Sequence, residues 1–382
     1  MKELTNNKLW ISFLPWAELR ESIKLGPITF WPYFEKGNQK KITDPEIKAY
    51  LNKLFNLFVD YEGNPIDTIT ICFYNHEFLL NDSVLKTIRQ AVDVLIFASI
   101  VPALKIIVSG GNYSWRSTIP SADNFELYFL RLPNSAQDDF ISFKFGNITS
   151  TVKIGSSKFQ RPFVISKALL GQDKELIAGF DKCFVNSFSV DVRERLLRSL
   201  EWFRLAHVEN ARLSELSKIV MMATAFEILL KFPSKSNEKK KYFVKYIKEY
   251  IVSRNFTKEN RKASDENCMC IKTLAEWWAS DFYNLRNKIV HGDNVSPDDL
   301  LHKNKYLKYK GLLTHLDIAD LVFLRCMMEE LLVNGCIGNS FRSSKVLNKL
   351  NQNNKSKDKH IESWIRSFWG FDAIYKALGW IL

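Results

Sequence analysis

An arginine and a histidine stand five residues apart in the phrase Arg286-Asn287-Lys288-Ile289-Val290-His291-Gly292. A guanidinium can bind a phosphate group through two parallel hydrogen bonds, and an imidazole can take up or release a proton near neutral pH. Asn287 and His291 are one helical turn apart, so a helix through this segment places them on one face, with Arg286 beside them. The three residues therefore predict phosphate binding combined with proton transfer.

A structural interpretation of the same phrase stays open. A histidine in the last turn of a helix interacts favourably with the helix dipole without any catalytic role. Gly292 would let the chain leave the helix without a side chain that crowds the site. The whole phrase is more specific than the Arg–His pair alone, because it joins an aromatic-rich helix, a polar residue after the arginine, two β-branched residues and a helix stop.

Long helical periodicity in the second half of the chain must position this phrase. Apolar spacing predicts helices over 191–207, 213–231, 238–253, 271–291 and 312–334. The second of these segments is apolar nearly all round, which predicts a central place in a helical bundle. The fourth carries a core stripe at helical spacing, formed by Trp278, Phe282, Leu285 and Ile289.

The first half of the chain has a different residue pattern. Segments rich in β-branched and aromatic residues predict strands at 68–74, 105–108, 126–130 and 140–145. Asp82-Ser83 can cap a helix that runs towards Ser99. The fold class that we expect is therefore α+β. It comprises a mixed α/β sensing or regulatory domain over 1–187 and a helical domain over 188–382 that ends in an amphipathic helix at 360–382.

Two phrases on the predicted helices carry a resemblance to a known family. Arg286–Gly292 resembles the R-x4-6-H motif of the HEPN superfamily, including the usual polar residue after the arginine. The segment Ala223-Thr-Ala-Phe-Glu227-Ile-Leu-Leu230 is similar to the "ALExLL" phrase of the Apea-like HEPN group. The resemblance covers roughly residues 190–335 and does not extend to the first 185 residues.

The resemblance implies a metal-independent endoribonuclease that needs no cofactor and works as a homodimer. The motif helices of two protomers would pack together, so that both Arg–His pairs line one cleft. His291 would act as general base or acid on a ribose 2′-OH, Arg286 would neutralise charge on the phosphoryl oxygens, and Asn287 would orient the phosphate or His291. The product would be a 2′,3′-cyclic phosphate.

The same resemblance implies a biological role. Members of this group are linked to abortive-infection defence against phage, which implies a toxin-like effector that cuts cellular RNA. We expect tRNA first, because its anticodon loop offers splayed bases. The N-terminal domain would then receive a phage-derived or nucleotide trigger. An alternative from another class stays open, in which the HEPN domain is a non-catalytic, dimerising module that binds nucleotides or RNA.

Two further residues are candidates for supporting roles. Glu227 would hydrogen-bond Arg286 and fix its orientation, although an acidic residue paired with a structural arginine is an equally simple interpretation. Tyr283 precedes Arg286 by almost one turn, and its hydroxyl would face the same cleft unless the ring serves only for packing.

Basic residues are concentrated in the second half of the chain, since residues 1–190 carry a net charge of +2 and the remainder carries +10. Two stretches there interleave cations with aromatic residues, which suits phosphate contact and base stacking but also suits a solvated helix face. The candidate RNA-binding residues are Lys239, Lys240, Lys241, Lys305, Lys308 and Lys310.

Composition bounds the remaining classes of function. Six scattered cysteines among 382 residues are typical of a reducing compartment, and Cys268-Met-Cys270 lacks a second ligand pair at zinc spacing. We expect no secretory signal, no membrane span and a cytoplasmic protein. The aromatic segment 360–382 could touch a membrane surface, but packing against the bundle or a second protomer is favoured because the segment has few basic residues.

Overall fold

The computed structural model describes residues 10–34, 45–75, 81–108, 121–131, 140–145, 148–153, 158–162, 171–185, 188–209, 213–250, 273–302 and 314–337. Strands in the first half and helices in the second give an α+β fold, as predicted. The chain divides into two compact units. Residues 1–102, 119–188 and 207–212 form the sheet unit, and residues 103–118, 189–206 and 213–382 form the helical unit.

Antiparallel strands build the sheet unit. The strands are β1 Trp10–Leu14, β2 Ile23–Leu25, β3 Ile28–Phe34, β5 Thr68–Tyr74, β6 Tyr128–Arg131, β7 Phe140–Phe145 and β8 Ile148–Lys153. Among the described residues they form one sheet in the order β2-β3-β5-β1-β6-β7-β8. The strands predicted at 68–74 and 140–145 are confirmed with the same bounds, and the one predicted at 126–130 is displaced slightly to β6.

The middle of this sheet is buried on both faces. On one face, Ile11 and Phe13 of β1 pack with α1 (Pro45–Phe55) and the short strand β4 (Phe58–Val59), which pairs with β9 (Phe159–Gln160). On the other face, Ser12 and Leu14 are buried as well. A strand covered on both sides loses the apolar–polar alternation of a half-exposed strand, so β1 is an almost continuous apolar run.

Helix α2 (Asp82–Val108) corrects the strand predicted at 105–108, which is its last turn. The β-branched residues there favour a strand locally, but the helix continues through Pro102. A proline lacks the N–H that would bond to the carbonyl four residues earlier, which is that of Ala98. The backbone N–H of Asp173 bonds to this Ala98 carbonyl at 2.9 Å. A distant segment of the sheet unit thus satisfies the acceptor that the proline leaves open.

The start of α2 also differs from the prediction by one residue. Asn81, rather than the pair Asp82-Ser83, caps the helix, because its side-chain oxygen accepts from the N–H of Val84 at 3.0 Å. Asp173, mentioned above, caps the following helix α4 (Lys174–Cys183) in the same way. Asn and Asp are both preferred at this position, so the sequence pattern alone does not separate adjacent candidates.

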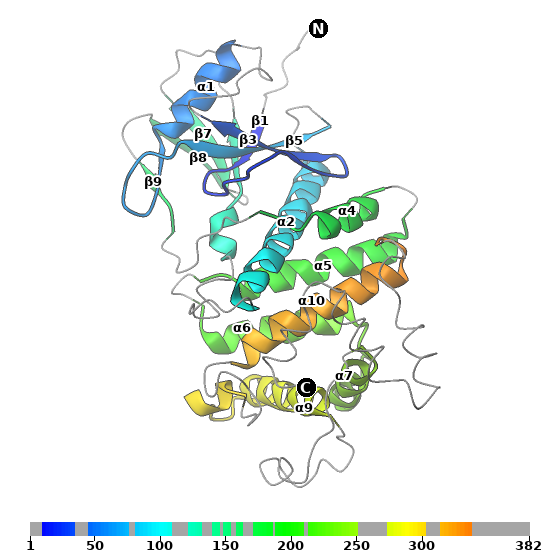
Figure 1. Ribbon diagram of the computed structural model, residues 1–382. Coiled ribbons are helices and arrows are strands. Elements are labelled where there is room, and N and C mark those ends of the chain that lie inside the picture. The colour runs from blue at the N-terminus through cyan, green and yellow to red at the C-terminus, as the bar shows by residue number, and fades with distance from the viewer. Residues whose placement is uncertain are drawn as a thin grey trace. The chain divides into compact units, whose positions relative to one another are not determined.

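The helical unit contains the helices predicted from apolar periodicity. They are α5 Val190–Ala206, α6 Glu215–Leu229, α7 Ser236–Tyr250, α9 Leu274–His291 and α10 His315–Val333. Helix α6 is central, since it contacts α5, α9 and α10, while α7 packs on α9 (Figure 1). The core between these helices is aromatic and includes Phe203, Phe226, Phe243, Trp278, Phe282 and Phe323.

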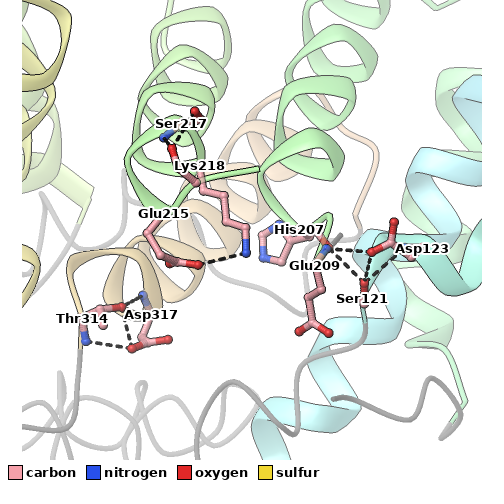
Figure 2. Close-up of polar contacts among 10 residues, drawn as sticks. Ser121, Asp123, His207, Glu209, Glu215, Ser217, Lys218, Thr314 and Asp317 are labelled. Atoms are coloured by element: carbon pink, nitrogen blue, oxygen red, sulfur yellow. Dashed lines mark hydrogen bonds and ion pairs between the residues drawn. The ribbon is translucent and has the colours of Figure 1, made fainter. Parts of the chain in front are cut away.

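Side-chain caps fix where these helices begin (Figure 2). Ser214 accepts the N–H of Ser217 at the start of α6, and Glu215 pairs with Lys218 at 3.1 Å across the first turn. Thr314 and Asp317 form a reciprocal capping box at the start of α10. Each such cap contributes about 1 kcal/mol to stability. In the sheet unit, Figure 2 shows the Asp123 carboxylate accepting the N–H of Glu209 at 2.7 Å.

Candidate functional site

Helix α9 carries the Arg286 phrase on its last two turns. Thr273 and Glu276 form a capping box at its start. Of the predicted stripe, Trp278, Phe282 and Leu285 are buried, whereas Ile289 is only partly buried. This packing fixes the rotation of the helix about its axis. Arg286 and Asn287, which follow the stripe residue Leu285, are partly exposed, whereas Tyr283 is buried.

Gly292 ends α9 in a left-handed conformation, with φ of 77°. The N–H groups of Gly292 and Asp293 bond to the carbonyls of Ile289 and Lys288, at 3.2 and 2.9 Å, in the pattern of a Schellman motif. A Cβ added at Gly292 would meet no described atom within 4 Å. Among the described residues there is thus no crowding for the glycine to relieve, and the residue is needed for its backbone angle.

The central helix α6 brings Glu227 to Arg286. One carboxylate oxygen of Glu227, Oε1, lies 3.3 Å from Nη2 of Arg286 and accepts a hydrogen bond of 2.8 Å from the hydroxyl of Tyr283. Its other oxygen, Oε2, lies 2.6 Å from Nζ of Lys239 on α7. The expected contact between Glu227 and Arg286 is present. Glu227 is the point where α6, α7 and α9 meet through polar groups.

Tyr283 lies inside the bundle. Its ring is 3% exposed and packs near those of Phe232 and Phe243, so it cannot face a second protomer or an open cleft as expected. Burial raises the pKa of its hydroxyl, and the hydrogen bond to the Glu227 carboxylate raises it further. The hydroxyl is therefore a fixed donor. It orients Glu227, while the guanidinium of Arg286 lies over the ring at 5.5 Å from its centre.

Asn287 completes the immediate surroundings of Arg286. Its side-chain oxygen accepts a hydrogen bond of 3.1 Å from Nη1 of Arg286, so the two terminal nitrogens of the guanidinium have different partners. Within the described residues, Nε of Arg286 is buried and has no hydrogen-bond partner. The Arg286 side chain is only 20% exposed. The guanidinium is thus held from two sides and keeps donors that an anion can use.

His291 lies one turn beyond Asn287 and is exposed at the end of α9. Helical spacing puts His291 and Asn287 on one face. Within the part of the chain that the structure describes, no hydrogen bond or ion pair joins the His291 side chain to Asn287 or Arg286. The structure thus brings Arg286, Asn287, Glu227 and Tyr283 into contact and leaves His291 free beside them.

The candidate RNA-binding lysines have different environments. Lys239 is paired with Glu227, and Lys240 donates to the side-chain oxygen of Asn284 at 2.8 Å, whereas Lys241 is exposed. Asn284 has no role in the sequence argument, because its partner lies on another helix and no fixed spacing connects the two. Other predicted features lie outside the described residues, namely Lys305, Lys308, Lys310, the Cys268–Cys270 pair and the segment 360–382.

A second polar pair lies near the start of α9 and also escaped the sequence argument. The rings of His302 and His315 are 5.4 Å apart, and His302 lies 5.1 Å from the ring of Trp277. Both imidazoles are almost fully buried. Among the described residues, both nitrogens of His302 and the Nδ1 of His315 have no hydrogen-bond partner. Burial lowers the pKa of His315 to about 4 and that of His302 well below its usual value.

Comparisons of the chain with known protein families, with curated proteins and with solved structures give no match. Within the described ranges, no cluster of three or more histidine, cysteine, aspartate or glutamate side chains is placed to hold a metal ion. In the same ranges, no helix has the length and apolar character that a membrane crossing requires.

Proposed function

We propose that this protein is a HEPN-type endoribonuclease of the Apea-like group, and that Arg286, Asn287 and His291 cut RNA without a metal ion. One observation carries the proposal. Arg286 is held by Glu227 and Asn287 beside an exposed histidine on the same helix. The proposal places the guanidinium on the phosphate and the imidazole on the adjacent ribose.

Arg286 supplies the charge in this proposal. During attack on phosphorus, negative charge grows on the non-bridging oxygens, and a fixed cation stabilises it without having to reorganise. The contacts to Glu227 and Asn287 hold the guanidinium before substrate arrives. The partly buried position strengthens its interaction with a phosphate, because the local dielectric constant is lower than in water.

His291 moves the proton in this proposal. As a general base it would take the proton of the ribose 2′-OH, whose oxygen then attacks the adjacent phosphorus. The bond to the 5′-oxygen breaks, and that oxygen leaves with a proton from a general acid. The products are a 2′,3′-cyclic phosphate and a 5′-hydroxyl. Because DNA lacks the 2′-OH, it binds without being cut by this route.

A homodimer through α9 is the assembly that we propose. Val290 lies between the core stripe and His291 and is 50% exposed. A second copy of α9 packed on this face would cover Val290 and bring two His291 side chains to one cleft. Tyr283, being buried, takes no part in this contact.

Restraint of the nuclease is the role that we propose for the sheet unit, because an enzyme that cuts cellular RNA in the cytoplasm must be controlled. That unit contains an open groove with a cavity volume of about 780 Å³, and its charged lining consists of Arg20, Lys24 and Lys174 together with Glu21 and Asp181. These cations suit an anionic trigger such as a nucleotide, although Lys174 is paired with Glu21 at 2.8 Å. Defence against phage, with tRNA as substrate, is the biological role that we propose for the whole chain.

A second candidate function has its own support. No hydrogen bond or ion pair joins His291 to the Arg286 cluster within the described residues, so Arg286 and Asn287 can bind a phosphate group without cleaving it. The helical unit would then be a non-catalytic, dimerising module for nucleotides or RNA. Binding uses the same groups as cleavage, and only the chemistry of His291 separates the two functions.

Substitution of His291 distinguishes these functions. We expect the full-length His291→Ala protein to fold and bind RNA like wild type and to lose cleavage, because an exposed last-turn side chain contributes little to packing. Asn294→Ala, which also changes an exposed side chain near the helix end, serves as the matched control and should cleave normally. Full ribonuclease activity in folded His291→Ala would exclude the proposed chemistry. RNA binding without cleavage by wild type would favour the binding module.

A further inference from the structure

The shortest polar contact of the Arg286 cluster belongs to a lysine from a third helix. Nζ of Lys239 lies 2.6 Å from Oε2 of Glu227, whereas Nη2 of Arg286 lies 3.3 Å from Oε1. The Lys239 and Glu227 side chains are only 23% and 14% exposed. A pair so short and so shielded is stronger than a solvent-exposed ion pair.

The two oxygens of Glu227 have different partners. Oε1 is shared by Tyr283 and Arg286, and Oε2 is taken by Lys239. A free carboxylate would bind a guanidinium through both oxygens at about 2.7–2.9 Å. Here Arg286 contacts one oxygen, at a longer distance. Because Lys239 binds Oε2, Glu227 does not form a bidentate ion pair with Arg286. The other terminal nitrogen of Arg286 donates a hydrogen bond to Asn287 instead.

Charge leads to the same conclusion. Two cations and one carboxylate give Arg286, Lys239 and Glu227 together a charge of +1. Without the lysine, Arg286 and Glu227 would neutralise each other, and an approaching phosphate would meet a neutral pair. The lysine therefore preserves the positive charge that a phosphate group requires, although its own ammonium is directed at a carboxylate.

We propose that Lys239 is a positioning residue, which keeps Arg286 available to a phosphodiester by occupying Glu227. This inference deepens the proposed function and rests on it. It differs from the direct RNA contact expected for the lysine run. The neighbouring contact between Lys240 and Asn284, at 2.8 Å, anchors this turn of α7 to α9 and so holds Lys239 in place.

The experiment uses the full chain and a fluorescent single-stranded RNA whose riboses are 2′-O-methylated, so that binding is measured without cleavage. We expect Lys239→Gln to raise the Kd about tenfold, which corresponds to a loss of about 1.4 kcal/mol. Lys245→Gln is the matched control, because Lys245 lies on the same helix, pairs with Glu249 and is 73% exposed. Its Kd should stay within about twofold of the wild-type value.

The double variant Glu227→Gln/Lys239→Gln tests how the lysine acts. Removal of both charges leaves the local charge at +1, so we expect the Kd to return to within about threefold of wild type. Cleavage of unmodified RNA should remain slow in this variant, since Arg286 has lost its anchor. Lys239→Arg, which keeps the charge, should bind RNA like wild type and shows whether the fold tolerates substitution at this position.

Three outcomes would overturn the inference. A Kd for Lys239→Gln equal to that of the Lys245→Gln control would show that Lys239 has no influence on the anion site. A double variant as weak as Lys239→Gln would show that the lysine contacts RNA directly. In both cases wild-type cleavage would leave the proposed function intact. A wild-type chain that neither binds nor cuts RNA would exclude the inference and the proposed function together.

Discussion

Polar groups pack near both ends of α9, and the two sets differ in charge and in exposure. Near its C-terminal end, Arg286, Glu227 and Lys239 are charged, partly exposed and paired with one another. Near its N-terminal end, His302 and His315 are buried, and several of their nitrogens have no hydrogen-bond partner among the described residues. The charged cluster thus lies where an anion can approach, whereas the neutral imidazole rings lie where water is excluded.

This difference indicates that the Arg286 cluster is a candidate site and that the histidine pair is a structural feature. A partly exposed cluster with a net positive charge can exchange an internal contact for a ligand at small cost. A buried imidazole cannot gain a proton without destabilising the bundle, so the histidine pair is suited to packing. Substitutions at the first end should therefore change activity, and changes at the second end should change stability.

The largest effect is expected at Arg286. We predict that Arg286→Ala reduces RNA cleavage about 10²- to 10³-fold, as for the loss of a preorganised charge at a reacting centre. The dimer should be at least as tight as in wild type, because two guanidinium groups facing one cleft repel each other. Cleavage assays and sedimentation test both parts. Dissociation of Arg286→Ala into monomers would contradict the shared cleft.

Acid should destabilise the other end of the helix. The pKa of His315 is lowered on folding from its ordinary value to about 4, and that of His302 is lowered as well. The folded state therefore holds fewer protons than the unfolded state. Stability should be complete above pH 6.5 and should decline as the pH falls towards 4, with a loss of about 3 kcal/mol from His315.

Chemical denaturation as a function of pH measures this loss. We expect the free energy of unfolding of the double variant His302→Leu/His315→Leu to fall less as the pH is lowered, because neither side chain can take up a proton. Asn294→Ala changes an exposed side chain that cannot be ionised and should keep the wild-type dependence of stability on pH. An unchanged dependence of stability on pH in the double variant would show that the buried pair does not govern acid stability.

Some elements of the fold could be predicted from the sequence, and others could not. Apolar periodicity predicted the helices of the helical unit, since each buries a stripe that repeats along the sequence. The prediction from β-branched residues failed at 105–108, because the helix continues through Pro102 and the distant N–H of Asp173 bonds the carbonyl that the proline leaves open. A prediction from the strand preferences of neighbouring residues cannot include this hydrogen bond to a distant segment.

The candidate site divides in the same way. The Arg286 phrase is local and could be found from spacing alone. The burial of Tyr283 and the pairing of Lys239 with Glu227 depend on how α6, α7 and α9 pack, which no single segment encodes. The sequence also does not distinguish the three adjacent lysines. In the structure they have different environments, as Lys239, Lys240 and Lys241 show.

A smaller effect is expected when Glu227 is removed. We predict that Glu227→Ala lowers the free energy of unfolding by about 2 kcal/mol, because it leaves Arg286 and Lys239 as partly buried cations without their common partner. Glu249→Ala is the matched control, since that glutamate forms an exposed pair with Lys245 and should cost about 0.3 kcal/mol. Equal losses in the two variants would show that the cluster is only a surface ion pair.

The smallest effect is expected at the helix end. Gly292→Ala should lower the free energy of unfolding by about 1 kcal/mol, because alanine is strained at the positive φ of this residue. Gly292→Asn should cost less, since asparagine tolerates the left-handed conformation. Thermal unfolding of both variants tests the order. A stable Gly292→Ala protein would show that α9 ends differently in solution.

Cleavage by the purified wild-type chain in the presence of EDTA tests the central claim most directly. The protein is incubated with total RNA, and the ends of the fragments are mapped chemically. The account predicts cuts that leave 2′,3′-cyclic phosphates and 5′-hydroxyls, at the same rate with and without the chelator. Intact RNA, or cleavage that stops in EDTA and leaves 5′-phosphates, would contradict it.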